Sequence, residues 1–287
     1  MDNDFIQIRK LQSGDIPGAM ELVLAEGWNQ TEKDWDILIR NPHNVCLAAV
    51  MEKKIIGTAT AMNYGNKVAW IGMVLVGKDF RGRGISKMLL FSLFEQLKSI
   101  KSVKLDATPA GQPVYQKLGF ENEYTMTRMV CPNVGQLPPA TGEIVPQKIQ
   151  KEDVPAILEL DRAAFGADRS PLLEAFIANF PEKGFMIKRD GKISGFALGR
   201  RGNKYHQVGP VTADSADDAR ILVRFALHHL QGRAVVIDIL NDKSELAEEL
   251  VSLGFEPQRP FQRMYRGENR YPGIGKKQFL ICGPEFG

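Results

Sequence analysis

Apolar and polar positions divide the chain into short strands and amphipathic helices. Residues 71–76 are apolar at five of six positions, which is typical of a strand buried on both faces. Residues 87–100 contain no Gly or Pro and are rich in Leu, Met and Phe, so they predict a helix. Between the two lies a basic turn with two glycines, at residues 81–86. A buried strand, a turn and a long helix therefore form the predicted centre of the N-terminal half.

The flanking sequence predicts a mixed α/β arrangement around this centre. Strands are recognised by alternating or continuous apolar positions, and helices by apolar stripes at helical spacing. The predicted strands are 5–9, 45–51, 54–62, 67–76, 102–108 and 127–130, and the further predicted helices are 16–24, 31–39 and 109–118. We expect the strand at 127–130 to close the first domain, because the Pro- and Gly-rich stretch 131–142 that follows has no periodicity and predicts a linker.

The second half repeats features of the first at a nearly constant offset. A shift of 138 residues places 15–17 on 153–155 and 54–57 on 192–195, and a shift of 135 places 118–120 on 253–255 and 128–129 on 263–264. Four short matches on corresponding elements predict a duplicated domain.

Composition limits the classes of function. A chain of 287 residues with 44% hydrophobic and 25% charged residues is typical of a soluble globular protein of two domains. The net charge of +3 gives no general attraction to nucleic acid or membrane, and no apolar run approaches the about 20 residues of a membrane span. Three cysteines and four histidines show neither disulfide nor metal-ligand spacing. We therefore expect a cytoplasmic protein that uses no metal and binds neither nucleic acid nor membrane.

The turn at residues 81–86 has the properties of an anion site. Gly82 and Gly84 lack a Cβ, so the backbone can approach a ligand closely. The turn leads into a helix N-terminus, which carries about half a positive charge. Arg81, Arg83 and Lys87 add cationic side chains. Together these features predict a binding site for a pyrophosphate.

The motif narrows the choice of diphosphate ligand. The dinucleotide pattern G-x-G-x-x-G fails because Lys87 stands third after Gly84, and no P-loop string occurs. The turn resembles the acetyl-CoA loop of the GNAT (Gcn5-related) N-acetyltransferases, [QR]-x-x-G-x-[GA], with Arg81 and Gly84 in place. Ser86 departs from the usual Gly or Ala at the last position. A plain basic surface turn and a nucleotide site without CoA are the alternatives.

A second stretch resembles the same family. Residues 115–120 match the GNAT pattern Tyr-x-x-x-Gly-Phe, in which the Tyr, here Tyr115, faces the CoA sulfur and can protonate the departing thiolate. The alternative for Tyr115 is a half-buried aromatic on an amphipathic helix. The resemblance implies acetyl-CoA as co-substrate, direct attack by an amine in a ternary complex, and splayed strands with exposed N–H groups. It implies coenzyme binding by Val74, Leu75, Val76, Arg81, Gly82, Arg83, Gly84, Ile85 and Ser86.

The sequence defines the acceptor only as an amine, which we expect to be small. Trp28 and Asn29 occupy the region where GNATs place acceptor-binding residues, although core packing equally explains Trp28. Asp106 and Glu26 are candidate general bases, each with a structural alternative, so neither is assigned. A small metabolite, an amino acid, an antibiotic and a protein N-terminus are all open.

The second half lacks these motifs. Neither offset rebuilds the loop, and Asp214, Asp217 and Asp218 place negative charge where a pyrophosphate needs positive charge. Leu250 stands at the position of Tyr115 and has no proton to donate. The chain therefore resembles the tandem GNAT proteins with a degenerate C-terminal domain, the YitH-like type.

The predicted architecture is two tandem α/β GNAT folds, each with a mixed α+β sheet, joined by the Pro/Gly-rich linker. Residues 1–130 form the predicted catalytic domain, 131–142 the linker, and 143–287 the degenerate domain without a pyrophosphate loop. The second domain could shape the active cleft, form a homodimer surface or only stabilise the fold. The alternative to an enzyme is a non-catalytic acyl-CoA-binding or sensing protein.

Overall fold

The N-terminal half supplies six strands and four α-helices to the computed structural model, which describes residues 6–138 and 144–287. The strands are β1 (Gln7–Lys10), β2 (Val45–Met51), β3 (Lys54–Tyr64), β4 (Val68–Val76), β5 (Ser102–Ala107) and β6 (Glu121–Cys131). The helices are α1 (Ile16–Ala25), α2 (Glu32–Arg40), α3 (Ile85–Gln96) and α4 (Gln112–Lys117). The order and type of these elements confirm the sequence prediction. The central helix begins two residues earlier than predicted and ends at Gln96, because the chain turns at residues 97–99.

The C-terminal half repeats this order. Its strands are β7 (Gln147–Lys148), β8 (Phe185–Arg189), β9 (Lys192–Arg201), β10 (His206–Ala213), β11 (Val235–Leu240), β12 (Glu256–Gly267) and β13 (Gln278–Leu280). Its helices are α5 (Val154–Phe165), α6 (Ser170–Asn179), α7 (Ala216–His228) and α8 (Ser244–Ser252). In the described residues, β13 is the one strand without a counterpart in the first half.

The repeated motifs perform the same local tasks in both halves. Asp15 and Asp153 accept hydrogen bonds from the backbone N–H groups of the third residues before them, at 2.8 and 2.9 Å, and so cap the turns that lead into α1 and α5. Gly119 and Gly254 follow α4 and α8 with φ angles of +84° and +88°, a left-handed conformation that favours glycine. The duplicated sequence thus marks duplicated helix boundaries.

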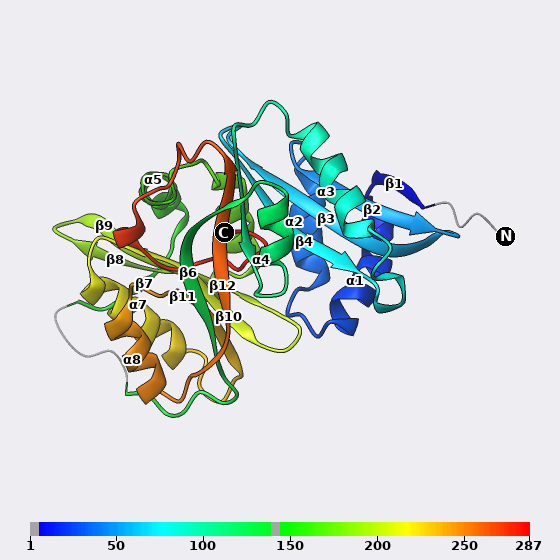
Figure 1. The fold of residues 1–287 in the computed structure, drawn as a ribbon. Coiled ribbons are helices and arrows are strands. Elements are labelled where there is room, and N and C mark those ends of the chain that lie inside the picture. The colour runs from blue at the N-terminus through cyan, green and yellow to red at the C-terminus, as the bar shows by residue number, and fades with distance from the viewer. Residues whose placement is uncertain (1–5, 139–143) are drawn as a thin grey trace.

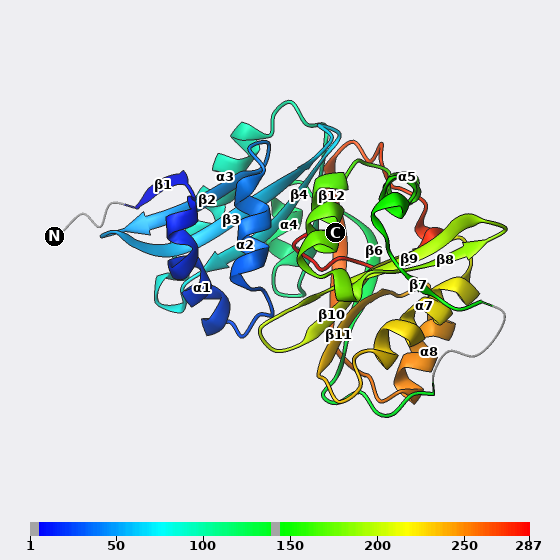
Figure 2. The same cartoon turned by 180° about the vertical axis from the view of Figure 1, so that it is seen from behind.

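All thirteen strands of the described residues join in one mixed sheet. Their order is β1-β2-β3-β4-β5-β12-β6-β11-β13-β10-β9-β8-β7. Apart from β13 the order is symmetric about the β12–β6 pair, so the two halves are related by a pseudo-twofold arrangement. Helices of each half cover the faces of that half's own strands (Figure 1, and from behind in Figure 2).

The two halves exchange their last long strands. β6 pairs with β11 of the second half, and β12 pairs antiparallel with β5 of the first. The two exchanged strands lie side by side at the centre of the molecule (Figure 1). Residues 127–130 are therefore a strand, as predicted, but that strand does not close the first sheet. The predicted domain boundary at residue 130 therefore divides the sequence into two halves, but the sheet continues across it.

Buried ion pairs fix this exchange. Arg128 of β6 donates to Asp238 of β11 at 2.7 Å through Nε and Nη2, and Arg263 of β12 donates to Asp106 of β5 at 2.8 and 2.9 Å. Each arginine comes from one half and each aspartate from the other. Because all four side chains are at most 5% exposed, removing one partner would leave a buried charge without compensation.

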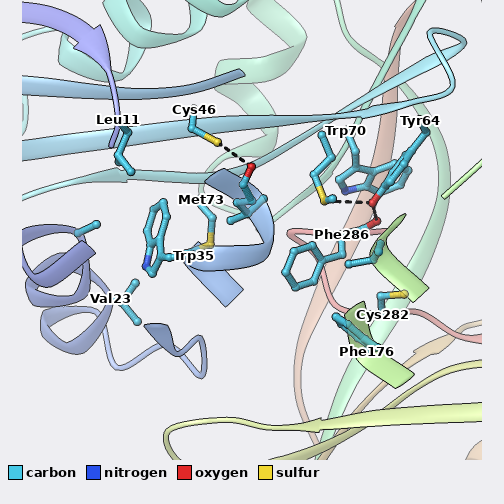
Figure 3. Packing of buried hydrophobic residues seen from close by; sticks show 14 of the residues in the cluster. Leu11, Val23, Trp35, Cys46, Tyr64, Trp70, Met73, Phe176, Cys282 and Phe286 are labelled. Atoms are coloured by element: carbon cyan, nitrogen blue, oxygen red, sulfur yellow. Dashed lines mark hydrogen bonds between the residues drawn. The ribbon is translucent and has the colours of Figure 1, made fainter. Parts of the chain in front are cut away.

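One hydrophobic core also spans both halves. It joins residues of α1, α2 and β2–β4 to residues of α5, α6, β9 and the segment after β13. Trp70 Nε1 donates to the Pro284 carbonyl at 3.0 Å, and the Tyr64 hydroxyl donates to the Phe286 carbonyl at 2.6 Å. Tyr64 and Trp70 lie close to Phe286, Phe176 and Cys282 in this core (Figure 3). The C-terminal segment therefore packs against the strands of the first half.

The predicted linker is only partly described. Residues 139–142 of it, like residues 1–5 of the first predicted domain, lie outside the described residues. Cys131 belongs to β6, and Val134 is buried and exchanges backbone hydrogen bonds with Gly232 and Arg233. The start of the linker is thus packed onto the second half.

Candidate active site

Strands β4 and β5 diverge and leave a split in the sheet. Their parallel pairing runs from Val68 with Ser102 to Ile71 with Leu105 and then stops. In the same place β4 carries an irregularity against β3, between the pairs of Thr58 and Thr60, and Met73 has a φ of +50°. A bulge of this kind bends a strand away from its neighbour. The edge of β4 from Gly72 onwards is therefore open toward α3 and α4.

Two threonines of β3 orient the bulge. The Thr60 hydroxyl donates to the Gly72 carbonyl at 3.0 Å, and the Thr58 hydroxyl donates to the Met73 carbonyl at 2.8 Å. Since a trans peptide places its N–H opposite its C=O, these two bonds turn the N–H groups of Met73 and Val74 away from β3 and toward the split. Two successive donors at one point of a cleft can stabilise a developing oxyanion.

The basic turn leads from the end of β4 into α3. Gly82 and Gly84 have φ angles of +79° and +75°, and a Cβ on either would meet no atom within 4 Å. The backbone angle, and not packing, thus requires glycine here. Among the described residues, the N–H groups of Gly84, Ile85 and Ser86 have no acceptor, as expected at a helix N-terminus. The turn therefore presents free amides at one end of the split.

Three of the residues predicted to bind coenzyme also have packing roles. Arg81 donates to the Val76 carbonyl at 3.2 Å and forms an ion pair with Glu26. Its guanidinium thus braces the turn against the residue that follows α1. Leu75 has its side chain in the hydrophobic core that spans both halves, and Ile85 has its side chain in a core of the first half, so only the backbone of each is available to a ligand.

A cavity of about 230 Å³ lies in the split and brings the predicted sites together with the second half. From the first half it is lined by Trp28, Val74, Ser86 and Tyr115, all residues that the sequence analysis assigned to coenzyme, acceptor or catalysis. From the exchanged strands and the C-terminal segment it is lined by Arg128, Arg259, Phe261, Pro284 and Glu285, to which the sequence gave no role in the site.

Tyr115 lies at the wall of the cavity. It lies on α4, packs edge-on against Phe120 at 5.7 Å between ring centroids, and faces the cavity. Its hydroxyl makes no hydrogen bond to the described residues, and burial raises the pKa of the phenol to about 12. At neutral pH the phenol therefore holds its proton, as a general acid must. Arg266 of β12 donates to the Leu118 carbonyl at 3.0 Å and so ties the end of α4 to the sheet.

The two predicted acceptor residues have different positions. Trp28 lines the cavity, but Asn29 does not. The Asn29 side chain accepts from the backbone N–H groups of Lys204 and Tyr205 at 3.0 and 2.9 Å and donates to the Tyr205 carbonyl at 3.1 Å. Asn29 therefore joins the residues between α1 and α2 to the β9–β10 connection. The structure gives it an interdomain role in place of the predicted contact with the acceptor.

The residues considered as bases or nucleophiles are engaged elsewhere. Asp106 lines the cavity but binds Arg263 with both carboxylate oxygens, and Glu26 binds Arg81. Cys46 and Cys282 are buried, and burial raises the pKa of each thiol to about 12. A thiolate nucleophile is thus disfavoured at both positions.

The corresponding split of the second half is filled. β10 and β11 pair in parallel from His206 to Val208 and then diverge, as β4 and β5 do. There β13 enters between them, with Leu280 opposite both Val211 and Ile239. A Cβ on Gly209 would lie 2.1 Å from the Ile281 carbonyl oxygen. The strand β13 therefore fills the gap between β10 and β11, whereas no strand of the described residues enters between β4 and β5.

The second half also lacks the basic turn. Only Asp214 and Ser215 separate β10 from α7, whereas eight residues separate β4 from α3. The Ser215 side chain accepts from the backbone N–H of Asp218 at 3.1 Å and caps α7. The Asp218 carboxylate is buried beside this helix end and binds Arg189 and Ser194 at 2.8 Å. The start of α7 is thus capped by a serine side chain, and the acidic residue in its first turn is bound by Arg189.

Comparison with known proteins assigns the class. The model described as "Acetyltransferase (GNAT) family" matches residues 11–120, and the model described as "Acetyltransferase (GNAT) domain" matches residues 157–280. Together the two matches span most of the chain. The chain belongs to the GNAT acetyltransferase family and carries two GNAT domains in tandem, as the sequence motifs predicted.

Individual relatives agree with this assignment. The chain is 26% identical to the uncharacterised N-acetyltransferase YitH of Bacillus subtilis over 87% of each chain. It is 25% identical to the holothin acyltransferase of a Pseudoalteromonas species over 86% of this chain and 83% of that protein. A proposed acetyltransferase of Pyrococcus horikoshii shares the fold, with a TM-score of 0.79 and 24% identity over 100% of this chain and 99% of that one.

The described residues contain neither a membrane-spanning helix nor a cluster of metal ligands. No helix there has both the length and the apolar composition needed to cross a membrane. No group of three or more His, Cys, Asp or Glu side chains in residues 6–138 and 144–287 is arranged to hold a metal ion.

Proposed function

We propose that the protein is an acetyl-CoA-dependent N-acetyltransferase whose first domain holds the coenzyme and whose acceptor is a small amine. The observation that carries the proposal is the alignment of three features along one split: free amides at residues 84–86, inward N–H groups at Met73 and Val74, and Tyr115 across the cavity. They correspond to the pyrophosphate, the thioester carbonyl and the thiolate of one extended ligand.

The proposed reaction needs no covalent intermediate. A neutral amine attacks the thioester carbon, and the N–H groups of the β4 bulge stabilise the oxyanion. Collapse of the adduct expels the CoA thiolate, which takes the Tyr115 proton. The buried cysteines support direct attack, because none of them is exposed to act as a nucleophile.

The second domain is proposed to bind no coenzyme. Support comes from β13 in its split, from its short β10–α7 connection and from the Ser215 side chain that caps the start of α7. The cytoplasmic location and the homodimer surface considered from the sequence stay predictions.

The test combines binding and turnover. Acetyl-CoA should raise the melting temperature of both the wild type and Tyr115→Phe. With a panel of amines, the wild type should release CoA thiol, and Tyr115→Phe should release it much more slowly. Binding without turnover by the wild type would favour an acyl-CoA sensor instead. A melting temperature that acetyl-CoA leaves unchanged would contradict the coenzyme site itself.

A further inference from the structure

Polar groups without a partner gather around the active-site cavity. Gln30 Oε1, Arg259 Nε and Glu285 Oε2 are buried, and none of them has a hydrogen-bond partner in the described part of the chain. All three residues line the cavity. Buried polar atoms in native proteins are nearly always paired. Three such atoms around one cavity indicate a polar ligand that completes their hydrogen bonds.

Arg259 is a cation without a carboxylate partner among the described residues. It lies on β12 opposite Arg128, with its guanidinium carbon 4.9 Å from the centre of the Phe261 ring. The nearby carboxylates of Asp238 and Asp106 are bound by Arg128 and Arg263. Burial and the neighbouring Arg128 lower the pKa of Arg259, as expected for a guanidinium that lacks a counter-ion. A half-buried guanidinium stacked on an aromatic ring is suited to a carboxylate ligand.

Glu285 provides the opposite charge. Its Oε1 binds Arg200, but Arg200 also binds Asp34, so two buried carboxylates share one guanidinium and Glu285 Oε2 is left without a partner. Glu285 lies at the start of the split: a Cβ on Gly72 would be 2.7 Å from the Glu285 Cα. Its carboxylate is thus beside the β4 bulge, where the thioester is proposed to lie. Gln30 adds a neutral acceptor to the same cavity.

We propose that the acceptor is a zwitterionic amine, an amino acid or a close analogue, with its carboxylate bound by Arg259 and its ammonium group by Glu285 and Gln30. This inference rests on the proposed acetyltransferase function and narrows its substrate class. Arg259 presents an unpaired donor and Glu285 an unpaired acceptor, and a zwitterion carries a carboxylate for the first and an ammonium group for the second. The cavity volume of about 230 Å³ favours a small molecule, because pockets for drug-sized ligands run from about 300 to 1,000 Å³.

The assignment also supplies the missing base. The ammonium group transfers one proton to Glu285 Oε2, and the neutral nitrogen forms the new C–N bond. The C–S bond breaks with its electron pair on sulfur, and sulfur takes the proton of Tyr115. The tetrahedral nitrogen returns a proton to Tyr115, and Glu285 releases its proton to water. The products are the N-acetylated acid, CoA thiol and one proton.

Matched acceptors test the carboxylate site. Thiol release and binding to the CoA-saturated protein are measured with the proteinogenic amino acids, their amides and their decarboxylated amines. We expect kcat/KM for the amino acids to exceed that for their amides and for their decarboxylated amines by about 10- to 100-fold. This is the range for one charge-assisted hydrogen bond. Arg259→Met should remove that preference through KM, Arg259→Lys should restore part of it, and the exposed control Arg201→Met should retain it.

Glu285→Gln tests the amine side. The carboxamide keeps the shape but cannot take the proton, so kcat should fall and its dependence on pH should change, while acetyl-CoA affinity stays constant. Equal use of amino acids and their decarboxylated amines, or an equal loss for both in Arg259→Met, would overturn the zwitterion proposal. So would a protein that binds acetyl-CoA but neither binds nor acetylates any amino acid. If the wild-type protein does not bind acetyl-CoA, that result would instead contradict the proposed function.

Discussion

A single added charge at Gly84 should weaken coenzyme binding strongly without unfolding the protein. Gly84 has a φ of +75°, and a Cβ there would meet no atom within 4 Å. Asp and Asn are the residues that tolerate this conformation best after glycine. Gly84→Asp and Gly84→Asn are therefore matched in shape and backbone cost and differ by one negative charge placed among the free amides of the turn.

The magnitude follows from the distance to the proposed pyrophosphate. Two unit charges about 4 Å apart interact by about 1 kcal/mol in bulk water and about 4 kcal/mol near a protein surface. With two phosphate charges, even the aqueous value gives about 2 kcal/mol, or about 30-fold in affinity. Gly84→Asp should thus bind acetyl-CoA at least about 30-fold more weakly than Gly84→Asn.

Isothermal titration calorimetry gives the two affinities, and a thermal melt without ligand verifies that both variants fold. The difference between them should shrink as salt is raised, because the charges lie at a solvent-accessible turn. Equal dissociation constants for Gly84→Asp and Gly84→Asn would refute the placement of the phosphates at this turn.

Three other predictions concern the bulge, the exchanged strands and the proton donor. Thr58→Val leaves the Met73 carbonyl without its hydroxyl donor, so the free energy of unfolding should fall by about 1–3 kcal/mol and kcat should fall as well; an unchanged kcat at lowered stability would separate the bulge from catalysis. Arg263→Met leaves Asp106 buried and unpaired, and urea unfolding should show a loss of about 3–5 kcal/mol; a loss below about 1 kcal/mol would contradict its role in holding β12. Because the pKa of Tyr115 is raised to about 12, its proton should persist to higher pH than that of a free phenol, and kcat should show no fall from its ionisation below about pH 10; such a fall, absent in Tyr115→Phe, would contradict the assignment.

The elements of the first domain could be predicted because their signals are local. The run at 71–76, the glycines of the basic turn and the apolar helix after it each depend on neighbours in sequence. The repeated motifs at Asp15 and Asp153 mark helix starts that the structure confirms. The duplication was therefore readable from short matches.

The strand exchange was not readable from the sequence. The strands β6 and β12 carry the same Arg-Met pair, so either could complete either sheet as far as local pattern is concerned. The choice depends on pairing between residues more than 100 positions apart, such as Arg128 with Asp238. The strand β13 has only three residues, too few for any periodicity, and so the filled split of the second half was missed.

The acceptor side of the cavity was missed for a related reason. Glu285 and Arg259 stand in no motif, and each enters the cavity on a segment that folds back from the second half. The sequence does contain a partial indication of buried charge at this place. Arg128 and Arg263 occupy corresponding positions of the repeat, and an arginine on a buried strand requires an acidic partner. The sequence alone could not show that Arg259 lacks one.

The most direct test of the central claim is a crystal structure of the protein with acetyl-CoA at saturating concentration. We predict one coenzyme per chain, with its pyrophosphate at residues 82–86, its pantetheine arm along β4 between Gly72 and Val76, and its sulfur facing Tyr115. Coenzyme between β10 and β11, with β13 displaced, would contradict the assignment of the coenzyme site to the first domain alone.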